Sequence, residues 1–440
     1  MTTALERIAD KARREPTLQF TSLAHHLTPE RLWQALHHMQ TSTAPGVDGV
    51  PHDEAVDTFP QWSREVLNAL HRKGYHPPPV RRVWIPKPGK AAKRPLGVPT
   101  IVDRTLQRSV AEVLSAIYEQ DFLPVSFGGR PGRGAHHALA TLHHILVNKR
   151  VNWVLEADLK NVFGSLDHAW MMQFVEQRVG DPRVLSLIRR WLKVGVLEAG
   201  EIQPSLRGTP QGGSISVLLS NVSLHYVLDL WFQKAIKPRL EGEAYLVRYV
   251  DDFVVCFEHQ RDAERFQAVL SQRLNKFGLD LEPTKTRLIA FGPRALQEAQ
   301  QPGRKKPETL YFLGFTHYCT RTRHGAFQVG RKTEKSRLKR TLQHLHSVMR
   351  QILHDPVEDQ SRRINELLRG HYAYFGMAGN YRSLKQVYRV VLRYWRRMLS
   401  RRSQKSPVTW EALLRILQRF PLKRPKLSLP YVALPQYIIL

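Results

Sequence analysis

The stretch Ala244–Phe257, AYLVRYVDDFVVCF, decides the fold expected for this chain. Two runs of β-branched and aromatic residues meet at Asp251 and Asp252, and this pattern is typical of a β-hairpin with a tight turn. Acids at a hairpin tip are often no more than a solvated turn. Both flanking runs are too apolar for a surface hairpin, however. We therefore expect two buried strands that carry this pair of carboxylates into an interior or a cleft.

A second apolar run also ends in an acid. Residues Val151–Asp158, VNWVLEAD, indicate a buried strand, and a helix is expected to begin near His168. Two Mg²⁺ ions about 3.5–4 Å apart, bridged by hard oxygen ligands, catalyse phosphoryl transfer in many enzymes. Carboxylates on adjacent strand ends meet that requirement rigidly. The three acids therefore predict a Mg²⁺ site, with Mn²⁺ as an alternative ion.

The rest of the chain alternates between helical and extended patterns and then becomes helical. Residues 1–40 indicate helices, with Thr28 as an N-cap before a proline. Residues 79–102 indicate a hairpin with a Lys/Gly-rich turn, and residues 103–120 a helix with regular apolar spacing. From residue 333 onward the pattern is almost wholly helical. The sequence thus predicts a mixed α/β protein with a helical C-terminal part.

The charge balance points to a polyanionic partner. The 440 residues include 67 Lys and Arg against 38 Asp and Glu, which gives a formal net charge of +29. Residues 331–440 alone hold 24 Lys and Arg against 6 Asp and Glu, a local net charge of +18. Such an excess is typical of nucleic-acid binding, and its concentration indicates a separate binding domain.

Other classes of protein fit this chain less well. No apolar run approaches the ~18 residues of a membrane span, and the start has no apolar signal segment. Cys256 and Cys319 form neither a CxxC pair nor a disulfide framework. His136, His137, His143 and His144 lack a consistent zinc-ligand pattern. We expect a cytoplasmic nucleic-acid protein without a membrane partner.

Ten motifs follow one another along nearly the whole chain. They are FTSLAHHLTPERLWQAL (20–36), APGVDGV (44–50), WIPKPGKAAKRPLGVPTIVDRTLQ (84–107), SFGGRPGRGAHHAL (126–139), EADLKNVFGSLDH (156–168), RGTPQGGSISVLLSN (207–221), RYVDDFVV (248–255), LEPTKTRL (281–288), YFLGF (311–315) and RGHYAYF (369–375). In this order they resemble the reverse transcriptases of bacterial group II introns and their free-standing relatives. The last motif resembles the thumb, or maturase domain X, of that family.

The resemblance implies a right-hand polymerase with fingers, a palm and a thumb. The fold class would be α/β (α+β), with an antiparallel sheet in the palm and a helical thumb. An N-terminal extension and the fingers would occupy residues 1–150. The palm would occupy residues 151–328, with part of the fingers near 170–210, and the basic thumb residues 329–440.

The resemblance also assigns roles to individual residues. Asp158, Asp251 and Asp252 would hold two Mg²⁺ ions, assisted by the backbone carbonyl of Leu159. The residues that would contact the incoming nucleotide are Lys87, Arg94, Phe163, Gln211 and Lys285. The residues that would contact primer or template are Tyr249, Val250, Leu313 and Gly314. The partners implied are an RNA template, a DNA or RNA primer, dNTPs and, for an intron-encoded protein, group II intron RNA.

Plainer interpretations stay open for several of these residues. Lys87 and Arg94 lie on a basic hairpin that could be a solvated turn, and Lys93 competes for either contact. Phe163 would stack under the sugar and exclude a 2′-hydroxyl, but it could equally be a core aromatic. Lys285 could be a surface lysine.

The sequence departs from the family pattern at three positions near the site. Val250 stands where Ala is usual, Gly164 where an acid is frequent, and Gly129 where Phe is frequent. None of these removes an expected metal ligand. They bear on the substrate pose and on the biological role.

Three functional hypotheses remain at this point. The chain could be an intron-encoded polymerase and splicing maturase, a free-standing relative that acts in DNA repair or defence, or an RNA-binding maturase with a vestigial polymerase. The intact acids argue against the third hypothesis. No Cys- or His-rich endonuclease module follows the expected thumb, which fits the second hypothesis and also introns that lack an endonuclease.

Overall fold

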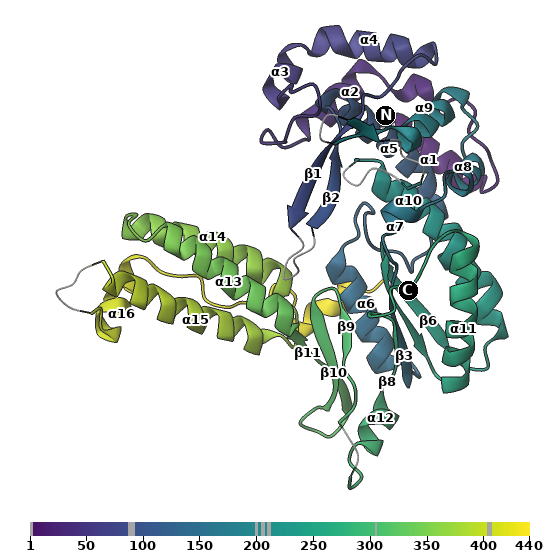
Figure 1. Cartoon of the computed structure of the whole chain (residues 1–440). Helices are drawn as coiled ribbons and strands as arrows, with labels where there is room; N and C mark the ends of the chain where they lie inside the picture. Colours follow the sequence, from purple (N-terminus) through teal and green to yellow (C-terminus); the bar gives the residue numbers. More distant parts are fainter. Residues whose placement is uncertain are drawn as a thin grey trace.

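The computed structural model describes residues 3–86, 93–198, 201–203, 207–208, 213–303, 306–402 and 407–440, with the backbone alone for Arg94. Figure 1 shows a helical N-terminal part at the top, a sheet-centred part below it and an elongated helical arm at one side. Within these described ranges, no helix is long and apolar enough to cross a lipid bilayer.

The centre of the molecule is a four-stranded antiparallel sheet in the order β6-β7-β3-β8. Its strands are β3 (Trp153–Asp158), β6 (Ala244–Tyr249), β7 (Asp252–Phe257) and β8 (Arg287–Ala290). The hairpin and the second acid-bearing strand that the sequence predicts are therefore confirmed.

This sheet is buried on both faces, which explains its nearly continuous apolar runs. Leu155 packs into the core that it shares with α11 (Gln260–Lys276), whereas Val154 packs into the core that it shares with α6 (Ala135–Asn148). Figure 1 shows these two helices on opposite sides of the sheet. Because side chains alternate along a strand, Asp158 points to the same face as Val154, toward α6.

A three-stranded sheet in the order β11-β10-β9 stands beside the central one. Its strands are β9 (Leu310–Phe312), β10 (Phe315–Arg321) and β11 (Phe327–Thr333), and the helix α12 (Pro293–Glu298) packs against β10. The residues Leu313 and Gly314 form the turn between β9 and β10, and both have positive φ angles, of 48° and 79°. This sheet links the centre of the molecule to the helical arm.

The N-terminal part contains a four-stranded sheet in the order β2-β1-β4-β5, surrounded by helices. Its strands are β1 (Val80–Pro86), β2 (Lys93–Val98), β4 (Val196–Glu198) and β5 (Glu201–Gln203). The helices that precede α6 are α1 (Ala4–Arg14), η1 (Ala24–His26), α2 (Pro29–His37), α3 (His52–Asp57), α4 (Phe59–His71) and α5 (Ile101–Asp121). Those between β3 and β6 are α7 (Val162–Ser165), α8 (His168–Glu176), α9 (Pro182–Lys193), α10 (Ser216–Leu224), η2 (His225–Asp229), η3 (Phe232–Ile236) and η4 (Lys237–Arg239).

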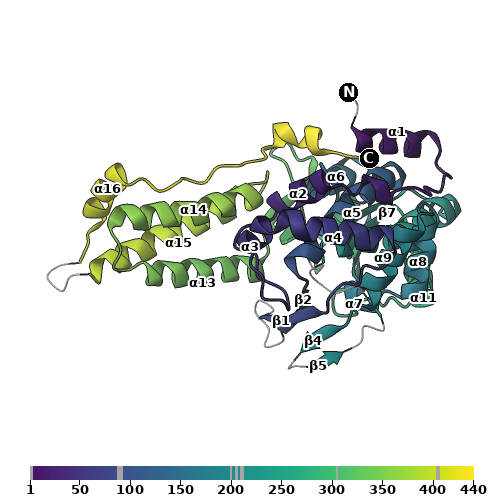
Figure 2. The same cartoon turned by 90° about the horizontal axis from the view of Figure 1, so that it is seen from above.

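The helical arm has a core of its own, with the fully buried Trp395 at its centre. Its helices are α13 (Lys335–Gln351), α14 (Val357–Phe375), α15 (Tyr381–Ser400) and α16 (Trp410–Arg419). Both Figures 1 and 2 show it projecting away from the rest of the molecule. The C-terminal segment then runs back along the arm, and η5 (Tyr431–Tyr437) packs on α6.

Candidate active site

The strand register brings two of the predicted acids together. Asp158 is the last residue of β3 and Asp252 the first of β7, and the two are direct cross-strand partners. Directly paired residues in an antiparallel sheet have Cβ atoms about 4.5–5.5 Å apart on one face. Asp251 lies in the turn before Asp252, and its carbonyl accepts a hydrogen bond from the Leu159 amide at 3.3 Å. Three carboxylates therefore converge at one end of the central sheet.

The tight turn at this point places a β-branched residue in a strained conformation. Val250 has a φ of 58°, in the left-handed region that is unfavourable for a β-branched side chain. The neighbouring loop approaches it closely at Gly128. A Cβ on Gly128 would lie 2.6 Å from Val250 Cγ2 and 2.8 Å from its backbone nitrogen. The turn is therefore packed against this loop, and only glycine fits there.

A buried arginine holds the same turn from inside. Arg248 is 0% exposed and pairs with the equally buried Asp229 at 2.6 Å. Its Nη1 donates to the carbonyl of Val250 at 3.0 Å and to Asn221 Oδ1 at 2.9 Å. Asn221 in turn donates to the Gly128 carbonyl at 2.8 Å. The network thus fixes both the turn and the loop that packs against it.

The acids repel one another strongly in the absence of a cation. Burial, together with the nearby charges of Asp158 and Asp251, raises the pKa of Asp252 to about 8. The ammonium of Lys285 contacts Asp158 Oδ2 and compensates part of this charge. Clustered hard carboxylate oxygens are the donor set that a divalent cation such as Mg²⁺ prefers.

The arrangement is not a closed metal cage. Among the described residues, no three His, Cys, Asp or Glu side chains are placed so that they could hold a metal ion by themselves. Mg²⁺ keeps several waters and takes one or two carboxylates together with substrate phosphates. The carboxylates therefore fit an open Mg²⁺ site that leaves coordination positions for other ligands.

The expected nucleotide contacts are only partly described. Lys87 and Gln211 lie outside the described residues, and of Arg94 in β2 only the backbone is known. Phe163 is half-buried in α7, the short helix that begins four residues after Asp158. These roles of Lys87, Arg94, Phe163 and Gln211 stay predictions.

The structure does bring Lys285 to the acids. Its ammonium contacts the Asp158 carboxylate, and 59% of its side chain is exposed to solvent. An exposed ammonium beside a carboxylate can leave that partner when a phosphate arrives, because the pair is weak in water. Its expected contact with phosphates remains a prediction.

The turn between β9 and β10, expected to contact the primer, is held by the arm. The hydroxyl of Tyr374 in α14 donates to the Leu313 carbonyl at 2.9 Å, and the Glu334 amide donates to the Gly314 carbonyl at 3.0 Å. His136 in α6 forms a hydrogen bond of 2.8 Å with the Tyr374 carbonyl. The arm, this turn and the central part are thus joined at one point.

Sequence reasoning missed the supporting network. The sequence identifies Arg248 only as part of a motif. It does not identify Asp229 and Asn221 as the partners of this arginine. The signal was present, since an arginine within the apolar run YLVRYV must find a buried partner. Its partner at position 229 is a distant acid that no local pattern identifies.

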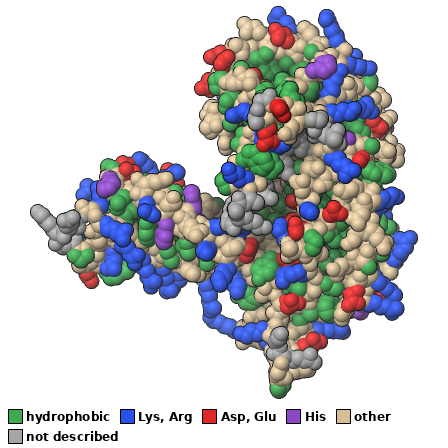
Figure 3. Space-filling view, in the orientation of Figure 1, with side chains coloured by type: hydrophobic (Ala, Val, Ile, Leu, Met, Phe, Trp, Pro, Cys, Tyr) green, Lys and Arg blue, Asp and Glu red, His purple; other side chains and the backbone are tan. Residues whose placement is uncertain are grey.

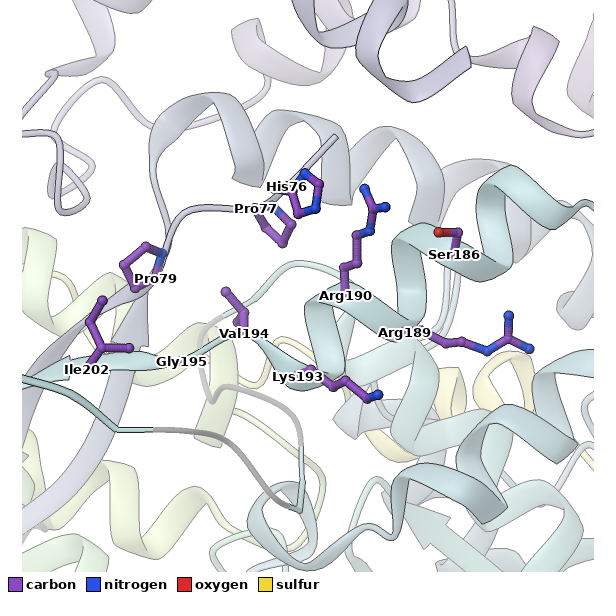
Figure 4. A pocket seen from close by; sticks show the side chains of 10 residues that line it. All are labelled: His76, Pro77, Pro79, Ser186, Arg189, Arg190, Lys193, Val194, Gly195 and Ile202. Atoms are coloured by element: carbon purple, nitrogen blue, oxygen red, sulfur yellow. The ribbon is translucent and has the colours of Figure 1, made fainter. Parts of the chain in front are cut away.

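A hollow of about 440 Å³ lies in the N-terminal part, apart from the acids (Figure 4). It is lined by Arg189, Arg190 and Lys193 of α9, among others. Arg190 already donates to the Tyr75 carbonyl, and Arg189 pairs with Glu176. None of the predicted site residues lines this hollow, so it does not coincide with the acids.

Comparison with known proteins agrees with this geometry. A family model described as reverse transcriptase (RNA-dependent DNA polymerase) matches residues 85–317, more than half of the chain. The group II intron-encoded protein LtrA of Lactococcus lactis subsp. cremoris is 33% identical over 231 residues, or 51% of this chain and 38% of that protein. The protein YkfC of Escherichia coli (strain K12) is 35% identical over 226 residues, or 50% of this chain and 59% of that protein.

A more distant relative is the mitochondrial nuclear intron maturase 3 of Arabidopsis thaliana, which is 26% identical over 205 residues, or 41% of this chain and 28% of that protein. The matched regions thus cover less than two thirds of each relative's own length. The family match spans the three acids and both strands that carry them. The chain therefore belongs to the reverse transcriptase family, in its group II intron type, and has the right-hand polymerase fold that its sequence predicts.

Proposed function

We propose that this chain is an RNA-directed DNA polymerase that adds dNTPs to the 3′-hydroxyl of a DNA or RNA primer on an RNA template. One observation carries the proposal. Asp158 and Asp252 are cross-strand partners at the end of a doubly buried sheet, with Asp251 in the adjoining turn. Rigid, adjacent and mutually repelling carboxylates suit nucleotidyl transfer assisted by divalent cations.

The family uses divalent metal ions, and the donor set of this chain fits Mg²⁺. Asp158, Asp251 and Asp252 would hold two ions together with the Leu159 carbonyl, and Mn²⁺ is an alternative. When bound, such ions lower the pKa of the primer hydroxyl and neutralise charge on the triphosphate. Burial, with the added repulsion of Asp158 and Asp251, raises the pKa of Asp252 to about 8, and this supports the assignment because bound cations would favour the charged carboxylate.

The protein's own side chains would then position the reactants. Lys285, next to Asp158, would move to the phosphates. Lys87, Arg94 and Gln211 would contact the incoming nucleotide as well. Phe163 would pack under its sugar. Tyr249, Val250, Leu313 and Gly314 would contact primer or template. In this scheme Arg248 acts at a distance, by fixing the turn through the Val250 carbonyl.

The helical arm would serve as an RNA-binding thumb. Exposed arginines and lysines of α15 follow a helical spacing: Arg382, Lys385, Arg389, Arg393 and Arg397. Figure 3 shows Lys and Arg side chains gathered over the arm. We assign the thumb to residues 329–440, the palm to 151–328, with part of the fingers near 170–210, and the remaining fingers to 1–150. Cytoplasmic localisation stays a prediction.

The biological role has two candidates. The chain could serve a group II intron, as polymerase and splicing maturase, or act as a free-standing enzyme in repair or defence. One relative's name identifies it as an intron maturase, and another's as an intron-encoded protein. A reading frame inside a folded group II intron RNA would favour the first candidate. A frame without intron RNA around it would favour the second.

Primer extension tests the proposed activity. The purified chain is given an RNA template, an annealed DNA primer and dNTPs, with Mg²⁺ or with a chelator. We expect extension that requires both dNTPs and Mg²⁺. An RNA-binding maturase with a vestigial polymerase would instead bind the same RNA and leave the primer unextended under every condition.

A further inference from the structure

A second buried arginine, far along the chain from the acids, has no acidic partner. Arg331 of β11 is 1% exposed, and its Nη1 donates to the Ala378 carbonyl at 3.2 Å. Its Nε and Nη2 have no hydrogen-bond partner in the described part of the chain. No Asp or Glu of the described ranges pairs with it, and burial lowers the pKa of its guanidinium to about 10.

Two histidines face this guanidinium. His317 is the direct cross-strand partner of Arg331, so the two side chains share one face of the β10–β11 hairpin. It is 0% exposed, and neither ring nitrogen has a partner among the described residues. His143 lies on α6, which packs against β11, near enough for the Arg331 charge to act on it, and its buried Nδ1 also lacks a partner among the described residues. Burial and the Arg331 charge lower the pKa of His143 to about 3 and that of His317 well below its ordinary value, which favours the neutral form of both rings.

The unpartnered atoms of Arg331 have a specific geometry. Nε and Nη2 lie on one edge of the planar guanidinium and present two parallel N–H groups. That edge is the one with which arginine binds anions in bidentate fashion. A neutral imidazole can add one N–H donor to the same ligand. A buried charge left without a partner is strongly unfavourable, so this edge requires a ligand.

We propose that Arg331, His317 and His143 form a buried site for a small inorganic anion. The anion is held by the Nε–Nη2 edge of Arg331 and by N–H groups of the two imidazoles. The phosphates of RNA or DNA cannot reach it, because Arg331 and His317 are buried. The site is therefore distinct from the acids and from the basic faces of the arm.

The position of the site indicates what the anion does. It lies where α6, the β10–β11 hairpin and the C-terminal segment meet, since η5 packs on α6 and the Ile439 amide donates to Thr141 Oγ1 of α6 at 3.0 Å. The arm leaves the hairpin directly at the end of β11. An anion at this point neutralises the buried charge of Arg331 and stabilises the base of the arm.

Bromide, an anion that is located by its anomalous scattering, tests for the site in the wild-type protein. Crystals of the full chain grown in sodium bromide are measured at the bromine absorption edge. We expect an anomalous peak within hydrogen-bonding reach of Arg331 Nε and Nη2. Ordered water on these donors, with no anomalous signal there, would overturn the proposal.

Thermal unfolding gives an independent test. The wild-type melting temperature is measured while chloride or sulfate replaces gluconate at constant ionic strength. An anion that binds only the folded state raises the melting temperature by about 2 °C for each tenfold increase in anion concentration above the dissociation constant. Comparison of chloride with sulfate shows which size of anion the site takes.

Two matched variants separate this site from general salt effects. Arg331→Met removes the buried charge while keeping the length of the side chain, and it should abolish the specific rise. Arg323→Met changes an exposed arginine of the same hairpin and should keep the wild-type response. Equal responses in all three proteins would contradict the proposal. Should Arg331→Met fail to fold, the bromide measurement still decides.

Discussion

Arg248 donates to the Val250 carbonyl, and we expect the geometry of the turn that carries Asp251 to depend on it. Its removal alone would leave the buried Asp229 without a partner, which costs about 3–5 kcal/mol. The double variant Arg248→Met/Asp229→Leu removes both charges and is expected to melt near the wild-type temperature. It also removes the hydrogen bond to the Val250 carbonyl. Because a small displacement of catalytic groups can cost ~10²-fold, we expect kcat for dNTP incorporation to fall at least about tenfold.

The Michaelis constant distinguishes positioning from a general structural defect. The KM for dNTP should change little in the double variant, since Arg248 is buried and does not touch the nucleotide. Asp229→Asn, which keeps a hydrogen-bonding partner for Arg248, should recover most of the rate. A folded double variant with wild-type kcat would show that the turn does not need this support.

Phe163 is expected to select the sugar of the incoming nucleotide. Truncation in Phe163→Ala opens space for a 2′-hydroxyl, so ribonucleotide incorporation relative to deoxyribonucleotide should rise at least about tenfold, or ~1.4 kcal/mol. Single-nucleotide insertion with both sugars measures this ratio. As a control, Phe174→Ala truncates a partly buried aromatic of α8 and should leave the ratio unchanged. An unchanged ratio in Phe163→Ala would identify Phe163 as a core residue only.

At the scale of the elements, local periodicity predicted most of the architecture. Apolar spacing predicts the helix at residues 103–120, and the residues that give this spacing are all buried in α5: Leu106, Val110, Val113 and Ile117. The N-cap at Thr28 is confirmed, since its side chain accepts from the Arg31 amide. The apolar runs of β3 and β7 were sufficient to place Asp158 and Asp252 at strand ends.

Contacts between distant segments could not be predicted in this way. Strand β1 pairs in parallel with β4, more than a hundred residues later, and no turn sequence connects them. The pattern of the C-terminal residues does not identify their packing partner, yet η5 packs on α6. The burial of Arg331 likewise depends on three segments that the sequence does not relate. Local patterns determine elements, whereas burial of polar residues depends on their assembly.

Several helices contain buried histidines that make the protein sensitive to acid. Burial lowers the pKa of His225 in η2 and of His371 in α14 to about 4, below the ordinary 6.5. At a pH between about 4 and 6.5, these histidines bind protons in the unfolded chain but not in the folded chain. Stability is therefore lost as the pH falls below about 6.5, by about 2 kcal/mol per histidine at pH 5.

Melting temperatures at pH 7 and pH 5 measure this loss. The variant His371→Phe replaces the imidazole by an apolar ring in a largely apolar site, and it should show a smaller decrease than the wild type. The matched variant His324→Phe, at an exposed position, should show the same decrease in melting temperature from pH 7 to pH 5 as the wild type. An equal decrease in all three proteins would contradict the assignment to His371.

At the scale of the whole molecule, the uneven charge predicts how RNA binding responds to salt. Neutralising about 6–10 phosphates would cost ~10³–10⁵ in affinity between about 50 and 200 mM salt. The variant Arg389→Gln/Arg393→Gln/Arg397→Gln removes three exposed charges from α15. It should weaken RNA binding and reduce the slope of log K against log salt by roughly 2–3.

A control with the same change in charge locates the effect. Arg261→Gln/Arg265→Gln/Lys276→Gln removes three exposed charges from α11, on the central part of the molecule. It should leave the slope close to that of the wild type. Equal slopes for the two triple variants would mean that RNA responds to net charge and that the arm is not its binding site.

The central claim is that the acids at the end of the central sheet catalyse nucleotidyl transfer. Single-turnover dNTP incorporation by Asp251→Asn tests it most directly, with primer–template affinity measured in parallel. Asp57→Asn, at an exposed position of α3, serves as the control for loss of one carboxylate. We predict that Asp251→Asn lowers the incorporation rate by at least about 10²-fold while affinity stays within about threefold of wild type. A wild-type incorporation rate in Asp251→Asn would contradict the claim.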